Sequence, residues 1–383
     1  MTGNRNTALI LTGGGARAAY QIGVLKAIAD QLPELTHPFP IICGTSAGAL
    51  NAVGLAANGS NFRESVDSLV KLWLGLKSSD IYRTDFWGVA KRMSHFVKSF
   101  LSGDEHDMPA SMLDATPLKS FLGKVMNAEG LAAAIEQGGI KAVSVTACGY
   151  KSGQSVSFFQ GGNHLEGWHL GQRVGMATRL EVDHLLASSA IPTIFPPVKI
   201  NREYFGDGVV RNMAPLSPAV HLGAERLLII GVSANRISAP QRVKARKFPN
   251  LAQVMEHMLN GAFLDVIEND IDKALLINQL INMIPSDTLA KSPLNLKPLD
   301  ILVISPSEPI DQIASRHTDD LPPAVRKFLG QSKSDPEGGA SMASYLMFER
   351  SFISELIDLG YNDARAHERQ IEQFLRAHPT PTA

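Results

Sequence analysis

The residues best suited to nucleophilic chemistry form a G-x-S-x-G pattern, Gly44-Thr45-Ser46-Ala47-Gly48, between a predicted strand and a predicted helix. Small residues on both sides of a serine let the backbone turn sharply, so that the hydroxyl projects from the end of the sheet. The following helix directs its amides and positive dipole end at the place where charge develops on an acyl oxygen. We therefore predict Ser46 as a nucleophile, with a plain tight turn as the alternative. The expected elbow residues are Gly44, Thr45, Ala47 and Gly48.

A second glycine-rich turn, Gly13-Gly14-Gly15-Ala16-Arg17, also follows a predicted strand and precedes a predicted helix. Three consecutive glycines have no side chains to keep a ligand away from the backbone N–H groups. The turn therefore suits an oxyanion hole or a phosphate cradle. Arg17 is expected either to steady this loop or to contact a phosphate head group. A helix-opening turn with a solvated arginine is the alternative.

The same glycines fit the dinucleotide-binding fingerprint G-x-G-x-x-A, which competes with the oxyanion hypothesis. That fingerprint requires an acidic residue at the end of the second strand to hold a ribose. The second strand instead ends in Cys43-Gly44-Thr45-Ser46, and Glu34 lies before it. No Gly-Lys-Ser/Thr follows the glycines, which excludes a Walker P-loop. A nucleotide-dependent oxidoreductase is therefore the disfavoured alternative.

A serine nucleophile needs a base to remove its proton. Asp207 lies in Gly206-Asp207-Gly208, after a predicted strand, and its flanking glycines allow a close approach to another turn. We predict Asp207 as the base, held by a turn made of Gly206 and Gly208, with an ordinary β-turn aspartate as the alternative. None of the histidines considered for this role lies in a glycine-rich turn at the end of a strand: His164, His169, His184 and His221.

Strands that alternate with helices must position these turns. Residues 7–12 and 39–43 are predicted strands, while 16–31 and 47–57 carry the patterns of helices. This alternation predicts an α/β fold with a mostly parallel sheet, in which ligands bind at the carboxyl ends of the strands. Further strands are predicted at 141–148, 155–160, 202–205, 226–233 and 299–306, and further helices at 179–190, 251–284 and 340–376.

The composition is that of an ordinary globular protein, with 44% hydrophobic and 19% charged residues over 383 positions. A net charge of −1 provides no global attraction to nucleic acid or to anionic membranes. The two cysteines, Cys43 and Cys148, lie in apolar strand-like runs and are predicted to be reduced core residues. They have no partners at metal-ligand spacing, so neither a metal nor a cofactor is expected. The sequence does not predict the oligomeric state.

The sequence has no signal-peptide core and no run of about 20 apolar residues. We therefore expect a cytoplasmic protein, with peripheral contact at the inner face of the membrane as a possibility. Residues 85–101 could provide such contact. Phe86, Trp87 and Phe100 lie there beside lysines and an arginine, in a pattern typical of a basic amphipathic helix or a lid. A helix that packs its apolar face on the core is the alternative.

Four blocks in the chain resemble the bacterial branch of the patatin-like phospholipase family: GGGARAAYQIGVLKAI, GTSAGALNA, ASSAIPTIFPPV and FGDGVVRNMAPLSPA. Their order and spacing match over roughly residues 7–235. The resemblance implies a three-layer fold with helices on both faces of the sheet, and a dyad of Ser46 and Asp207 without a catalytic histidine. It also implies an oxyanion loop made of Gly13, Gly14, Gly15 and Arg17. Ala18 and Val209 depart from the family pattern, which puts the shape of the pocket in doubt.

By this resemblance, residues 1–235 are expected to form the catalytic core. Residues 236–383 are expected to form a mainly helical C-terminal extension that contributes a strand near 299–306. The implied function is a serine acyl-hydrolase that cleaves lipid esters, of the phospholipase A or lysophospholipase type, with a phospholipid or other lipid ester as substrate. A lipid-binding or regulatory module that keeps this fold without turnover is the main alternative.

Overall fold

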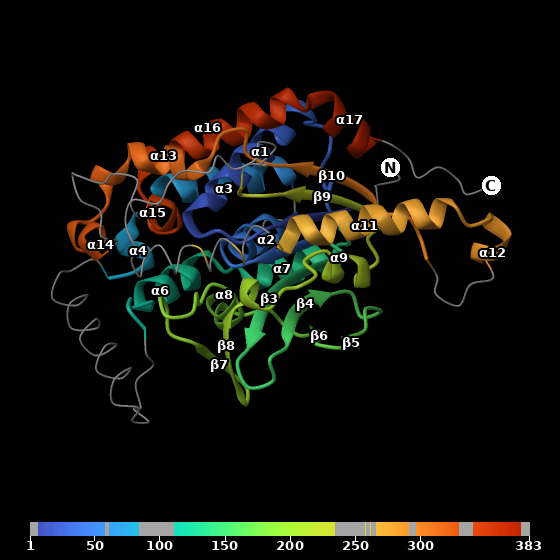
Figure 1. Cartoon of the computed structure of the whole chain (residues 1–383), viewed down its shortest axis with the longest axis horizontal. Helices are drawn as coiled ribbons and strands as arrows, with labels where there is room; N and C mark the ends of the chain where they lie inside the picture. The colour runs from blue at the N-terminus through green and yellow to red at the C-terminus, as the bar shows by residue number, and fades with distance from the viewer. Residues whose placement is uncertain are drawn as a thin grey trace, which may run out of the picture.

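The structure is a computed structural model that describes residues 7–57, 61–83, 111–233, 257, 261, 266–290, 296–328 and 340–376. One ten-stranded sheet runs through the described part, with the strand order β10-β9-β1-β2-β3-β4-β6-β5 (Figure 1). Strands β7 and β8 lie off this path and attach through β3. The strands are β1 (Thr7–Leu11), β2 (Ile41–Thr45), β3 (Ala142–Gly149), β4 (Ser155–Gly161), β5 (Trp168–Leu170), β6 (Arg173–Ala177), β7 (Val198–Ile200), β8 (Glu203–Asp207), β9 (Arg226–Ile230) and β10 (Asp300–Ile304).

Helices cover both faces of this sheet. They are α1 (Ala19–Gln31), α2 (Ala47–Ala57), α3 (Phe62–Gly75), α4 (Ser78–Ile81), α6 (Thr116–Val125), α7 (Ala128–Glu136), α8 (Val182–Ser188), α9 (Ser217–His221), α11 (Val266–Asn282), α12 (Ser286–Ala290), α13 (Ile310–Arg316), α14 (Pro323–Phe328), α15 (Ala340–Leu346), α16 (Arg350–Ala366) and α17 (Glu368–Arg376). Short 3-10 turns are η1 (Gly15–Ala18), η2 (Gly208–Val210) and η4 (Thr318–Asp320).

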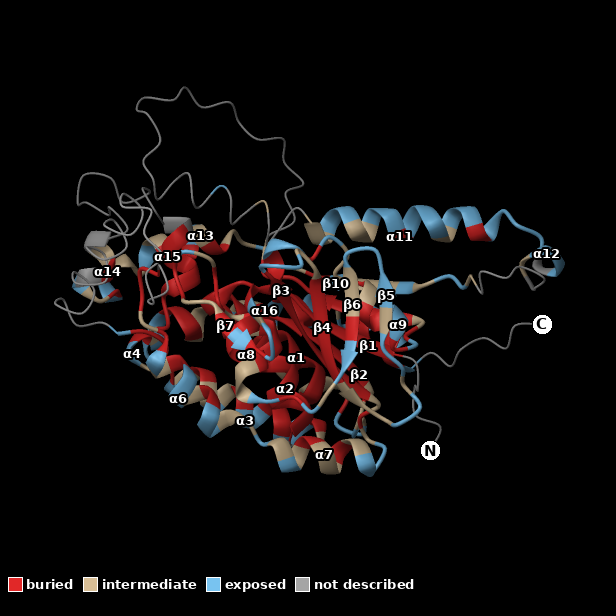
Figure 2. Cartoon of the chain, turned by 90° about the horizontal axis from the view of Figure 1, so that it is seen from below, coloured by how far each residue is buried: buried red, intermediate tan, exposed pale blue. Residues whose placement is uncertain are grey.

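The centre of the sheet is parallel, as predicted. Strands β10, β9, β1, β2 and β3 all pair in parallel, whereas β4 and β8 pair with β3 in the antiparallel sense. Strand β1 is buried along its whole length, which explains its continuous apolar run. Leu9 and Leu11 face a core with α1, α2 and α16, and Ala8 and Ile10 face a smaller core with α9 and α11. The predicted three-layer α/β class is confirmed, and Figure 2 shows the buried sheet between its helices.

Strand β2 begins two residues later than predicted, at Ile41. Pro40 has no N–H to give to a sheet ladder, so the strand pairing begins after it. The helix predicted at 47–57 is present as α2, but the prediction missed β5, β6 and β7, and also α3, α4, α6 and α7, which lie between α2 and β3. Of the helix predicted at 251–284, the structure has α11, and most of its earlier residues lie outside the described part. Residues 85–101 also lie outside the described residues.

The C-terminal helices pack directly on the first helix. Figure 1 shows α16 (red) along α1 (blue), where the two backbones approach at glycines. A Cβ at Gly23 would lie 2.0 Å from the Ile357 carbonyl oxygen, and one at Gly360 would lie 2.1 Å from that of Tyr20. The Tyr20 hydroxyl also donates to Asp363 Oδ2 at 3.0 Å. The expected boundary at 235–236 falls outside the described residues and stays a prediction.

Candidate active site

The G-x-S-x-G segment forms a strained turn between β2 and α2. Ser46 has a φ of 56°, in the left-handed region that residues other than glycine seldom adopt. A Cβ at Gly48 would lie 2.3 Å from the Leu11 carbonyl oxygen, because the first turn of α2 packs against the end of β1. A Cβ at Gly44 would lie 2.4 Å from the carbonyl oxygen of Gly48. The elbow geometry therefore requires small residues at these positions.

Strands β2 and β8 meet end to end along one edge of β3. Thr45, the last residue of β2, pairs with Thr146, and Asp207, the last residue of β8, pairs with the next residue, Ala147. The opposite edge of β3 is occupied by β4 through these same positions, so β2 and β8 must share the remaining edge. Two strands that run toward each other in adjacent registers bring Ser46 and Asp207 together.

Gly208 allows the two turns to approach this closely. A Cβ on this residue would lie 2.1 Å from the carbonyl oxygen of Thr146 and 3.1 Å from Cγ2 of Thr45. Gly206, on the other side of Asp207, lies against the ring of Tyr150. The chain turns directly after Asp207 into η2, and the Val209 N–H donates to Asp207 Oδ1 at 3.0 Å.

The Asp207 carboxyl is buried, and desolvation raises its pKa to about 7, against the opposing influence of the Ser46 side chain and the Val209 amide. Oδ2 has no hydrogen-bond partner among the described residues. The influence of the Ser46 side chain on this pKa places the predicted nucleophile next to the predicted base. A base that is buried beside the hydroxyl it must deprotonate suits this pair of roles.

The glycine loop lies beside the elbow and is supported by the C-terminal part of the chain. Gly15 has a φ of 55°, and a Cβ there would lie 2.2 Å from the carbonyl oxygen of Tyr345 in α15. Arg17 is buried, donates to the Ser344 hydroxyl at 2.6 Å and lies over the Tyr345 ring at 4.1 Å. Of the two roles considered for Arg17, these contacts favour steadying the loop.

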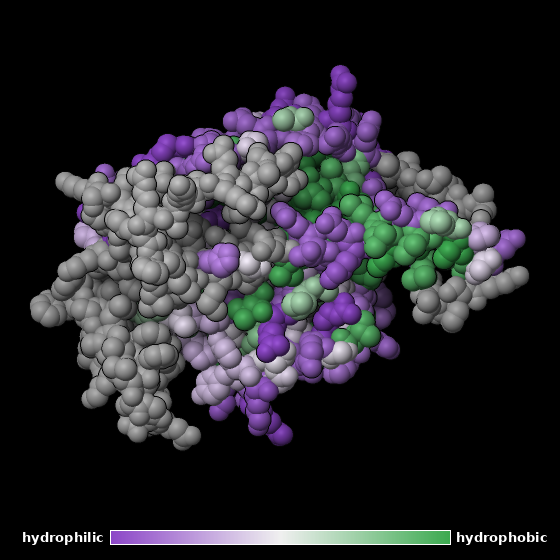
Figure 3. Space-filling view, viewed as in Figure 1, coloured by the Kyte–Doolittle hydropathy of each residue, from purple (hydrophilic) through white to green (hydrophobic). Residues whose placement is uncertain are grey.

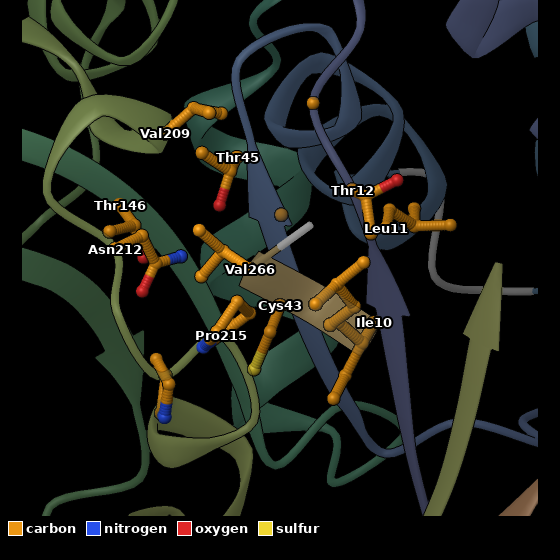
Figure 4. Close-up of a pocket in the computed structure, with 14 residues that line it drawn as sticks. Ile10, Leu11, Thr12, Cys43, Thr45, Thr146, Val209, Asn212, Pro215 and Val266 are labelled. Carbon is orange, nitrogen blue, oxygen red and sulfur yellow. The ribbon is translucent and has the colours of Figure 1, made fainter. Parts of the chain in front are cut away.

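A narrow, largely apolar cavity of about 30 Å³ adjoins both glycine turns (Figure 4). Gly13, Gly44 and Thr45 line it from the two turns, and Val209 lines it from the segment after Asp207. In Figure 4, Thr146 and Asn212 face Thr12 and Ile10 across the cavity. The first turn of α11 contributes Val266 and Ile267 to the wall. The cavity is therefore lined by neighbours of all three predicted motifs, while Ser46 and Asp207 themselves are not among its lining residues.

The last residue of α8 and the segment that follows it hold both predicted catalytic residues, a role that sequence reasoning missed. The Ser46 N–H donates to the Ser188 hydroxyl at 2.8 Å, and this hydroxyl donates to the Thr146 carbonyl oxygen at 2.7 Å. Two residues later, the Ala190 carbonyl oxygen accepts from the Asp207 N–H at 2.9 Å. The available signal was the block ASSAIPTIFPPV, which contains these residues.

A buried hydrogen-bonded network connects the glycine loop to the elbow helix. The Gln21 amide donates to the Thr12 carbonyl oxygen at 2.9 Å, and Asn51 donates to Ala18 and to Gln21. The Trp73 N–H completes the network by donating to Asn51 Oδ1 at 2.7 Å. Buried polar groups satisfied in this way fix one arrangement of the backbone around them.

The surroundings of His184, His221 and Cys43 point to structural rather than catalytic roles. His184 is buried against Phe158, and its Nδ1 accepts from the Glu181 N–H at 3.0 Å. His221 stacks on Trp168. Burial raises the pKa of Cys43 to about 12, which keeps this thiol neutral near pH 7. In the described ranges, no group of three or more His, Cys, Asp or Glu residues is placed to hold a metal ion.

The sequence model of the patatin-like phospholipase family matches residues 9–220, a span that includes both Ser46 and Asp207. The chain therefore belongs to the patatin-like phospholipase family. A cGAMP-activated phospholipase of Pseudomonas aeruginosa (strain BWHPSA011 / Pa011) is 29% identical over 211 residues, which are 54% of this chain and 53% of that protein. The chain thus matches about half the length of this relative.

Two solved structures resemble the chain weakly. Human GIVD cytosolic phospholipase A2 is 11% identical with a TM-score of 0.45, covering 97% of this chain and 60% of its own. VipD from Legionella pneumophila is 12% identical with a TM-score of 0.35, covering 92% and 67%. These values are too low to carry weight for function. Within the described residues, no helix has the combined length and apolarity needed to span a bilayer.

Proposed function

We propose that the protein is a serine acyl-hydrolase that cleaves the ester bonds of lipids through a dyad of Ser46 and Asp207. The observation that carries the proposal is the meeting of β2 and β8 on one edge of β3, which brings a strained serine against a buried carboxylate. Membership of the patatin-like phospholipase family supports the lipid class of substrate.

In the proposed reaction, Ser46 Oγ attacks the ester carbonyl carbon while its proton passes to Asp207. The tetrahedral intermediate then collapses, the bond to the alcohol breaks, and Asp207 gives the proton to the departing oxygen. Water attacks the acyl-enzyme in the second half, giving its proton to Asp207, and Ser46 is released when that proton returns to Oγ. Asp207 must be ionised at the start of each half, and its pKa near 7 makes it a stronger base than an exposed aspartate.

The glycine loop is proposed to stabilise the oxyanion of both tetrahedral intermediates. The backbone N–H groups of Gly13, Gly14 and Gly15 donate to no backbone oxygen of another described residue, so they are available as donors. The N-terminus of α2 adds a favourable dipole behind Ser46. Such donors are effective because they are already oriented when charge develops.

The apolar lining of the cavity, from Ile10, Leu11 and Val266, suits the hydrocarbon side of a lipid ester. At about 30 Å³, the cavity must widen to admit an acyl chain. A defined panel of phospholipids and lysophospholipids, with products identified by mass spectrometry, tests the function. Fatty acid release by the parent protein but not by Ser46→Ala supports the proposal. Binding of lipid without any release would favour a non-catalytic lipid-binding module.

The pH dependence of turnover should follow the Asp207 carboxyl. Because the base must be deprotonated and its pKa is about 7, kcat/KM on a soluble ester should rise about tenfold per pH unit below 7 and level off above it. A profile that is already flat from pH 5 to 8 would contradict this assignment.

The same carboxyl should make the fold less stable as the pH rises. Its folded pKa lies above the ordinary value of 3.8, so its favourable contribution is present below about pH 4 and is lost as the pH rises to about 7. The loss is on the order of 4 kcal/mol. Denaturant unfolding of the parent and Asp207→Asn at pH 5 and 8 measures it, and the variant should lack this part of the pH dependence.

Ser188→Ala should reduce kcat without a large change in KM, because it removes the acceptor for the Ser46 N–H and the donor to Thr146. An unsatisfied buried group costs about 1–3 kcal/mol, so a fall of roughly ten- to a hundredfold is expected. Ser189→Ala is the matched control, since its hydroxyl contacts neither group. Equal turnover in the two variants would rule out this positioning role.

A further inference from the structure

The outer face of α11 carries an unusual concentration of exposed apolar side chains. Leu276, Leu280 and Met283 are 56%, 53% and 80% exposed. Leu275, Ile277 and Ile284 flank them and are also exposed. Figure 3 shows hydrophobic side chains gathered over α11, and Figure 2 shows the helix exposed along most of its length. From residue 274 to residue 286 the chain has no charged side chain.

These exposed side chains do not form the face by which α11 packs on the core, because the opposite face of the helix makes those contacts. Ile267, Ile271 and Ala274 pack against the smaller core, and Ile281 is 4% exposed. Asn278 exchanges two hydrogen bonds with the Leu299 backbone, at 2.7 and 2.8 Å. The anchored positions repeat at helical spacing, which leaves residues 276, 280 and 283 about half a turn away, on the outside.

We propose that this outer face, defined by Leu276 and Leu280 of α11 and by Met283 directly after the helix, is the surface with which the protein sits on a lipid bilayer or micelle. The proposal rests on the lipid hydrolase function proposed above. It differs from the segment at 85–101 in that it depends on apolar contact rather than on basic residues.

The position of α11 argues for a lipid surface as the occupant. Val266 and Ile267, in the first turn of α11, line the cavity beside the elbow. One continuous helix therefore connects the wall of the cavity with the exposed apolar face. Leu276 lies ten residues from Val266, which is about 15 Å along a helix axis. This distance is comparable to one leaflet of the ~30 Å hydrocarbon core, so a lipid drawn from that surface has its ester within reach of the cavity.

A second copy of the chain suits this surface less well. One face of a 17-residue helix is about 25 Å long and about 10 Å wide, whereas each partner in a stable dimer usually buries about 800 Å². The absence of charged residues from 274 to 286 also provides no ion pairs to fix the register of two proteins.

The test compares Leu276→Gln/Leu280→Gln/Met283→Gln with the parent, both in a Ser46→Ala background, for binding to phosphatidylcholine vesicles by flotation. Glutamine keeps a good helix propensity at exposed positions, so the fold should be retained. The matched control is Leu170→Gln/Met176→Gln, which removes exposed apolar side chains from β5 and β6. We expect binding of the α11 variant to fall at least tenfold, with the control unchanged and little effect of salt on the parent.

Hydrolysis separates this inference from the proposed function. With Ser46 present, the α11 variant should keep its turnover of a soluble short-chain ester within about twofold, while hydrolysis of vesicle lipid falls. Vesicle binding equal to that of the parent would overturn the lipid-surface inference, as would a change from dimer to monomer with binding unaffected. Loss of vesicle binding in a protein that hydrolyses no ester would refute the proposed function and leave the docking surface standing.

Discussion

Asp207→Asn is expected to lower kcat on lipid and soluble esters by about 10³-fold or more, and Ser46→Ala to abolish turnover above background. The asparagine keeps the size of the side chain and the bond from the Val209 N–H, but it cannot accept the serine proton. Steady-state kinetics at pH 8, above the raised pKa of the carboxyl, gives the cleanest comparison.

A matched control is available at Asp363, another buried aspartate, which accepts from the Tyr20 hydroxyl at 3.0 Å and is on α16. Asp363→Asn should change turnover by no more than a few fold. If Asp207→Asn retained turnover within tenfold of the parent, Asp207 would not be the base, and the nucleophile would need another partner.

Gly208→Ala should be the most damaging change outside the two proposed catalytic residues, with turnover reduced by about 10²-fold or more. A methyl group there would meet the Thr146 backbone at 2.1 Å, so either β8 or the end of β2 must move. Ser46 directly follows β2 and Asp207 is the last residue of β8, and a displacement of about 1 Å between reacting groups can cost 10²-fold in rate.

Gly123→Ala, on α6, is the control for that prediction, because no atom lies within 4 Å of its would-be Cβ. It should leave both turnover and the melting temperature near those of the parent, since alanine is the better helix former. Soluble-ester kinetics and thermal unfolding of the two variants check the result. A Gly208→Ala protein as active as Gly123→Ala would show that the dyad does not depend on this close approach.

The parallel centre of the fold could be predicted because its signals are local. Short apolar runs such as residues 7–12, glycine breaks and the helical pattern of 47–57 all lie within a few residues of each other. Strand β5 could not be found in this way, because it has three residues and mixed exposure. The antiparallel pairing of β8 with β3 is equally invisible, since it joins residues about 60 positions apart.

The candidate site also has a part that local sequence signals predict and a part that they do not. The glycine turns and the chemistry of Ser46 and Asp207 follow from the types of neighbouring residues. The contacts that hold them come from distant segments: Ser188 reaches Ser46 across 142 positions, and Ser344 reaches Arg17 across 327. No local pattern predicts such contacts, because they exist only once the sheet has assembled.

The contact between Gly15 and Tyr345 makes the proposed oxyanion loop depend on residues far beyond the family motifs. The family match ends at residue 220, yet the carbonyl of Tyr345 forms the wall behind the loop that is proposed to hold the oxyanion. Arg17 lies over the ring of the same tyrosine and donates to the hydroxyl of Ser344, so it would lose both partners without this part of α15. A portion of the chain that keeps these supporting contacts of the loop must therefore reach at least to residue 345, well beyond the recognisable motifs.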